Sequence, residues 1–216
     1  MRQITQILTP LFLVCSLFYS AMIKAQTATE DTLMNLAIHG SLWTFVGSLI
    51  WGKNPFTEGS QLKPQWGLGT QLGVDNDILL TQTQLTRPFQ NTLYQAHQWQ
   101  LNAHWEFDIG YWQSNQKQPL NASGYFIGIT PVFNYLWQGP GLKPYLEVGA
   151  GIKYLDNIVI ENRYKSTQFQ FGDIFGFGLQ QGSFQIGYRY LHISNANIAL
   201  PNPGNNFQTL HFQYLF

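Results

Sequence analysis

From about residue 65 onward, apolar and polar residues alternate in segments of roughly ten residues, and Gly, Pro, Asn and Asp separate these segments. An alternation with a period of two places successive side chains on opposite faces of a strand. The pattern predicts eight strands, joined by one short turn and by longer loops: Gln65–Val74, Asp77–Thr86, Gln98–Trp112, Gly124–Tyr135, Lys143–Leu155, Thr167–Gln180, Ser183–Ser194 and Phe207–Phe216.

The two faces of these strands differ in a way that is unusual for a soluble protein. One face is aromatic and aliphatic, whereas the other carries Gly and Gln instead of the charges expected on the outer face of a sandwich. Charged residues make up only 10% of the chain, which is too few for a sheet whose outer face contacts water. An apolar face in contact with lipid and a polar face lining a narrow lumen explain both patterns. The predicted fold is therefore all-β: an eight-stranded antiparallel transmembrane β-barrel over residues 63–216, in the outer membrane.

The N-terminus reads as a secretory signal, with a basic start, an apolar run from Ile7 to Tyr19 and small residues after it. We expect cleavage after Ala25, with cleavage after Ala21 as the alternative. Removing residues 1–25 takes away Cys15, the only cysteine, so thiol and disulfide chemistry are excluded. It also changes 11 basic and 11 acidic residues to 9 and 11, a net charge of about −2, which gives no basic patch for nucleic acid.

Residues 26–62 form an N-terminal extension whose structure the sequence leaves open. Leu33–Trp51 has no Asp, Glu, Lys or Arg and is long enough for a membrane helix. Within it, however, apolar and polar residues alternate from Met34 to Leu42, which is typical of a strand. A ninth strand would break the even count.

The candidate chemistry lies at the end of the seventh strand. His192 and Ser194 are two residues apart, so their side chains share a face, and an imidazole that takes the hydroxyl proton makes a serine nucleophilic. A lone histidine near a strand end is more often only an interfacial residue. If Gln181–Gly182 is the hairpin turn, Asp173 pairs with Tyr190 and lies diagonal to His192. Asp173 then either stays at the headgroup boundary or assists the site.

Asn195 and Asn197 follow the serine where the strand ends. Asn tolerates the left-handed backbone conformation, so this turn can direct amide N–H groups at an oxyanion. An ordinary turn explains the same residues equally well.

At this point the sequence resembles a known family. "HISNANIALPNPGNNF", together with "PYLEVGAGIKYL" and "FQFGDIFGFGL", is similar to the PagL-type lipid A 3-O-deacylases over roughly residues 98–216. The resemblance implies an outer-membrane barrel that hydrolyses the ester-linked acyl chain at position 3 of lipid A on its membrane-facing wall. By position it implies these roles: Ser194 as nucleophile, His192 as base, Asn195 and the backbone near Asn197 as oxyanion hole, and Asp173 and Asn202 as residues near the substrate.

Two positions depart from the family pattern. Asn197 stands where Gly is common, and Asn206 stands where a Glu is expected to orient the histidine. An amide cannot stabilise an imidazolium as a carboxylate does, although it can fix the tautomer. Asn206 therefore keeps a second hypothesis open, a non-enzymatic barrel of structural or adhesive type.

The sequence indicates neither a metal site nor a cofactor. The five histidines, His39, His97, His104, His192 and His211, show no ligand spacing on one face beside an acidic cluster. Ester hydrolysis by Ser and His needs only water. The expected partners are lipid A and the outer membrane, and the sequence leaves open whether the barrel acts alone or as a homodimer.

Overall fold

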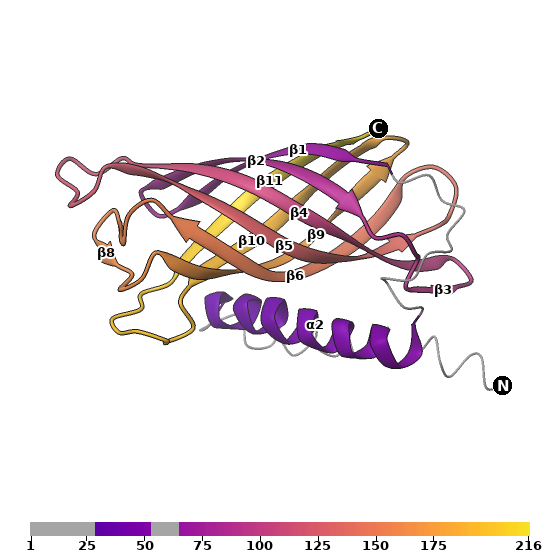
Figure 1. Cartoon of the computed structure of the whole chain (residues 1–216). Coiled ribbons are helices and arrows are strands. Elements are labelled where there is room, and N and C mark those ends of the chain that lie inside the picture. Colours follow the sequence, from indigo (N-terminus) through magenta and orange to yellow (C-terminus); the bar gives the residue numbers. More distant parts are fainter. Residues whose placement is uncertain (1–28, 53–64) are drawn as a thin grey trace.

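The computed structural model describes residues 29–52 and 65–216, and the second range forms a closed antiparallel barrel of eight long strands (Figure 1). All eight predicted strands are present, and their ends lie within two residues of the predicted ends. The predicted barrel is thus confirmed. Its strands are β1 (Gly67–Asp75), β2 (Ile78–Pro88), β4 (Trp99–Ser114), β5 (Ser123–Trp137), β6 (Lys143–Leu155), β9 (Phe169–Gln181), β10 (Phe184–Ser194) and β11 (Asn205–Leu215).

The barrel closes through pairing of β2 with β4, and its first and last strands, β1 and β11, are neighbours. The short β3 (Tyr94–Ala96) adds to β4, and β7 (Val159–Ile160) pairs with β8 (Arg163–Tyr164) inside the loop before β9. Gly67 pairs with Leu215, so both ends of the barrel lie at the end that holds the short β9–β10 turn (Figure 1). The longer loops after β4, β6 and β10 lie together at the opposite end, which we call the loop end.

One predicted register is wrong. The β9–β10 turn is Gly182–Ser183, not Gln181–Gly182, and Gln181 pairs with Phe184. Gly182 has φ +57°, a left-handed conformation that glycine adopts readily, and this fixes it as the first turn residue. Every pair shifts by two residues, so each side chain keeps its predicted face. Asp173 therefore lies directly opposite His192 instead of diagonal to it.

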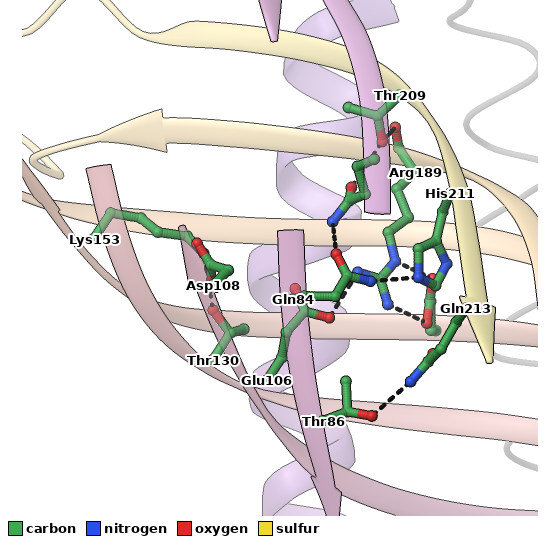
Figure 2. Close-up of polar contacts among 12 residues, drawn as sticks. Gln84, Thr86, Glu106, Asp108, Thr130, Lys153, Arg189, Thr209, His211 and Gln213 are labelled. Atoms are coloured by element: carbon green, nitrogen blue, oxygen red, sulfur yellow. Dashed lines mark hydrogen bonds and ion pairs between the residues drawn. The ribbon is translucent and has the colours of Figure 1, made fainter. Parts of the chain in front are cut away.

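The barrel interior holds many charged and polar side chains, and most of those drawn in Figure 2 bond to one another. Arg189, completely buried, donates two hydrogen bonds to Glu147, at 2.5 and 3.0 Å, and one to Glu106 at 2.7 Å. Lys153 pairs with Asp108 nearer the loop end. Ionised groups can be buried away from water when they are paired and hydrogen-bonded, as these are. The lumen is therefore packed protein and not a channel.

The outer wall is apolar, as the alternation predicts. Side chains that point outward from the strands are exposed and large, among them Leu72, Ile109, Ile127, Phe177 and Leu210. Their belt surrounds the barrel and matches the lipid-facing surface of an outer-membrane protein.

The N-terminal extension contains a helix, α2 (Thr29–Trp51), which runs along the outside of the barrel (Figure 1). The open choice between helix and strand for Leu33–Trp51 is thereby decided in favour of a helix. Within residues 29–52 and 65–216, no helix combines the length and the hydropathy that crossing a bilayer requires. The predicted signal peptide lies outside the described residues.

Candidate active site

Three neighbouring strands bring the candidate residues into one row at the loop end. In the β9–β10–β11 register, Asp173 lies opposite His192 and His192 lies opposite Asn206. All three belong to the outward face of their strands, and His192 and Asp173 are only 6% and 5% exposed. The structure thus brings together an acid, an imidazole and an amide that the sequence places up to 33 residues apart.

Asn206 holds the His192 ring in one orientation. Its Oδ1 accepts a hydrogen bond from His192 Nδ1 at 2.6 Å and another from the Tyr190 hydroxyl at 2.7 Å. Because an amide oxygen only accepts, this contact requires the proton on Nδ1. In the neutral ring the lone pair then lies on Nε2, which is the state that a general base needs.

Ser194 ends β10 on the same face as His192 and is 8% exposed. Its Oγ accepts a hydrogen bond from the backbone N–H of Ala196 at 3.4 Å. Ala196 and Asn197 have φ values of 51° and 62°, so the predicted left-handed turn is present. Left-handed backbone at a non-glycine residue is uncommon and is retained where the surrounding structure enforces it.

Asn195 and Asn202 hold this turn in place. The backbone N–H of Asn195 donates to Asn202 Oδ1 at 2.9 Å, and its side-chain amide donates to the carbonyls of Lys165 and Ala199 at 3.0 and 2.8 Å. Asn202 also donates to Asn197 Oδ1 at 3.2 Å. Asn195 is fully buried, so in this arrangement it fixes the shape of the turn from within the loop.

The comparisons with known proteins identify the family. The family model described as "Lipid A 3-O-deacylase (PagL)" matches residues 77–215, well over half of the chain and every residue of the row. The chain belongs to the PagL family of lipid A 3-O-deacylases. It is accordingly a hydrolase that acts on lipid A, located in the outer membrane.

Two curated members of the PagL family and one crystal structure give the degree of similarity. Lipid A deacylase PagL of Pseudomonas aeruginosa is 25% identical over 130 residues, which are 60% of this chain and 73% of that protein. The protein of that name from Bordetella bronchiseptica is 33% identical over 107 residues, 49% of this chain and 57% of that one. The crystal structure of the outer membrane enzyme PagL shares the fold, with a TM-score of 0.63, 22% identity, and coverage of 68% of this chain and 98% of that chain.

Several residues that support the site in this PagL-family barrel were not found from the sequence. Asp75, at the end of β1, accepts hydrogen bonds from the Asn206 backbone N–H at 3.1 Å and from the Asn205 side chain at 2.8 Å, and it pairs with Arg163. It therefore anchors the start of β11 behind the orienting amide. A β-carbon on Gly204 would lie 2.5 Å from His192 Cε1, so only glycine lets the loop approach the ring so closely.

Lys165 is a second residue that the sequence analysis missed. It is completely buried in the loop before β9, and its ammonium group donates to the backbone carbonyls of Pro203 and, at 3.3 Å, Ile193. These carbonyls flank the site from both sides: Ile193 precedes the serine and Pro203 precedes Gly204. Lys165 thus ties the end of β10 to the loop that covers it.

Replacing Lys165 with methionine should lower kcat for lipid A by about tenfold or more with little change in KM, because hydrogen bonds from a charged donor contribute about 1.5–3 kcal/mol each and here hold the turn.

Burial, and then the charge of Arg163, lowers the pKa of Lys165 to about 7. The unfolded chain therefore binds the extra proton between pH 7 and the ordinary lysine value of ~10.4, and stability contributed by this site rises with pH over that window. In Lys165→Met, the midpoint temperature of thermal unfolding should lack this rise with pH.

Lys117→Met, at an exposed lysine in the β4–β5 loop, is the matched control and should leave both the rate and the pH dependence unchanged. An unaltered kcat in Lys165→Met would show that the loop keeps its shape without the ammonium group.

Among the residues that the structure describes, no group of three or more His, Cys, Asp and Glu side chains is placed to hold a metal ion.

Proposed function

We propose that this protein removes the ester-linked 3-hydroxyacyl chain from position 3 of lipid A by a Ser194–His192 mechanism. The observation that carries the proposal is the 2.6 Å contact between His192 Nδ1 and Asn206 Oδ1, which leaves Nε2 as a base on the face that Ser194 shares. Family membership supports the substrate, and the position of the row on the lipid-facing wall supports access for a lipid that stays in its membrane.

The reaction proceeds in two steps that together consume one water molecule. Ser194 Oγ attacks the ester carbonyl while His192 Nε2 takes the hydroxyl proton, and the left-handed turn at Ala196 and Asn197 supplies backbone N–H groups to the oxyanion. The same proton passes to the departing sugar oxygen, leaving an acyl-serine. Water, deprotonated by Nε2, then releases the 3-hydroxy fatty acid and restores the serine. In this scheme Asn195 and Asn202 hold the turn, and Asp173 contacts the polar part of the substrate beside His192.

Mass spectrometry of lipid A from cells with and without the protein tests this proposal. Cells that express it should contain lipid A lighter by one 3-hydroxyacyl group, and the missing group should be the ester-linked chain at position 3. Loss of an acyl chain from any other position would contradict the regiochemistry while keeping the deacylase class. Unchanged lipid A in cells that contain folded barrel would contradict the proposal as a whole.

The topology gives a further prediction, because lipid A occupies the outer leaflet. β10 has 11 residues, which at ~3.3 Å each and a tilt of ~40° rise about 28 Å, enough to carry Ser194 from the short-turn end across the apolar band. The loop end should therefore face the cell exterior. Leu120→Cys, 81% exposed in the β4–β5 loop, should react with a membrane-impermeant maleimide on intact cells, whereas Leu142→Cys, 54% exposed at the opposite end, should react only after lysis. Reversed labelling would put the site in the wrong leaflet.

A further inference from the structure

The helix α2 packs on the barrel through its small and hydroxyl-bearing residues. The buried positions Ala37, Ser41, Thr44 and Ser48 recur every three or four residues and form one stripe along the helix. Beside them, a β-carbon on Gly40 would lie 3.1 Å from Val148 Cγ1, so the helix backbone lies very close to β6. Across the contact, the hydroxyl groups of Thr44 and Tyr135 lie 2.5 Å apart, whereas Ser48 bonds to the Phe45 carbonyl of its own helix. Small residues that allow close approach are typical of helix packing inside membranes.

Several large side chains of α2 point away from the barrel, whereas Leu36 is buried against it. Leu42, Trp43 and Ile50 are 53%, 64% and 63% exposed. A helix on the surface of a soluble protein has the reverse arrangement, with its large apolar residues against the core. The strands that α2 contacts also expose large side chains outward, Tyr154 on β6 and Phe177 on β9, so the outer side of the helix continues the lipid-facing belt of the barrel.

The first half of α2 lies beside the candidate active site. Leu36 and Ala37 pack in one cluster with Val148 of β6 and Phe175 of β9, and Phe175 follows Asp173 by two residues on the same face. At the other end of the helix, Gly52 approaches the Leu93 carbonyl in the segment between β2 and β4. The helix thus runs from the loop end toward the short-turn end and covers the β6–β9 side of the wall (Figure 1).

The opposite side of the row is hollowed, and within residues 29–52 and 65–216 no helix lies over it. A shallow hollow of about 470 Å³ lies on the outer wall over β1, β2, β10 and β11, lined by apolar side chains that include Leu72, Val74, Tyr188 and Leu210. It begins at Gln208, two residues from Asn206 on the same face of β11, and Val74 pairs with Gln208. Beyond Gln208, an acyl chain leaving the row in this direction meets a mostly apolar wall.

We propose that α2 is embedded in the membrane as part of the barrel wall and that lipid acyl chains contact its outer side. In this position the helix leaves the active site open to lipid from one side only. The helix blocks the β6–β9 approach, so the scissile acyl chain of lipid A lies over β10, β11 and β1, in the hollow next to Val74. This inference rests on the proposed function for its substrate, whereas the placement of α2 stands on the helix alone.

Spin labels test the placement of α2. The mature chain is predicted to lack cysteine, so single labels at Leu42→Cys and Trp43→Cys can be read in phosphatidylethanolamine–phosphatidylglycerol vesicles with oxygen as the apolar and a nickel chelate as the aqueous relaxation reagent. We expect both labels to match a lipid reference at Ile109→Cys, an outward residue on β4, and to differ from a water reference at Leu120→Cys. Labels that match Leu120 would overturn the proposal, and so would labels shielded from both reagents, which would indicate a second protein copy on α2.

Bulky substitutions test the path of the acyl chain. Val74→Trp should fill the hollow and lower the rate on lipid A about tenfold, while the rate on soluble p-nitrophenyl butyrate, whose chain is too short to reach the hollow, stays near that of the wild type. Ile109→Trp, on the strand opposite β10, is the matched control and should change neither rate.

Equal rates on lipid A in Val74→Trp and Ile109→Trp would overturn the acyl-chain path, as would a loss on both substrates in a folded barrel. If Val74→Trp does not fold, Leu210→Trp in the same hollow decides the question. If the wild type does not cleave lipid A at all, the proposed function fails instead, and the spin labels still decide where α2 lies.

Discussion

Replacing Ser194 or His192 with alanine should reduce deacylation of lipid A by about 10³-fold or more, because each change removes one half of a nucleophile–base pair that acts as a unit. The barrel should still form in both variants. The two side chains lie on the outer wall, away from the Arg189 cluster and the lumen, so their loss opens no cavity in the barrel interior. Lipid A mass spectrometry measures the activity, and heat-modifiable migration on gels measures folding.

Ser183→Ala, at the turn between β9 and β10, is the matched control for the serine change and should deacylate lipid A as the wild type does. A Ser194→Ala protein with near wild-type activity would remove the covalent mechanism, although the family assignment would stand.

Replacing Asn206 with alanine should lower kcat by about 10²–10⁴-fold, since the amide is the group that selects the His192 tautomer and a wrongly oriented imidazole is a poor base. Asn206→Asp should keep or raise the activity, because a carboxylate accepts the same Nδ1 proton and also stabilises the imidazolium. Steady-state kinetics on purified lipid A in detergent separate kcat from KM for both variants.

Tyr190→Phe is the control for Asn206, because it removes the second hydrogen bond to the same oxygen while keeping the amide, and it should cost much less activity. Should Asn206→Ala match the wild type while Asp173→Asn is inactive, Asp173 would be the residue that orients His192. Its place directly opposite the histidine makes this a real alternative.

The strands could be predicted from sequence because lipid and a filled lumen impose opposite demands on the two faces of every strand. The pairing of β9 with β10 could not be predicted as securely. Turns at Gln181–Gly182 and at Gly182–Ser183 both pair apolar residues with apolar residues, and the alternation is identical after a shift of two. The pairing of Gln181 with Phe184 separates the two registers, and this pairing appears in the structure alone.

The form of Leu33–Trp51 was ambiguous for a different reason. The usual sign of a surface helix is a stripe of large apolar residues toward the core, but in α2 the side toward the barrel is mostly Ala, Ser and Thr, together with Leu36. Large residues occupy the other positions, so the helical period was hidden and a short alternation stood out instead.

The site likewise contains residues that the sequence indicated and residues that it did not. His192, Ser194 and Asn206 lie within 14 residues of one another, and their types alone suggested chemistry. Asp75 and Lys165 contribute through contacts that span 131 and 38 residues, to the Asn206 backbone and the Pro203 carbonyl. Nothing in a single sequence relates such distant positions, and both residues are ordinary surface types by composition.

The buried cluster of Arg189, Glu106 and Glu147 has a consequence for the cell as well as for the fold. An outer membrane protects its owner by excluding toxic solutes, and every open pore weakens that defence. Here three charged side chains, none of them exposed, link β10 to β4 and β6 through the interior of the barrel. A barrel whose interior is filled in this way adds no open pore to the membrane that holds it.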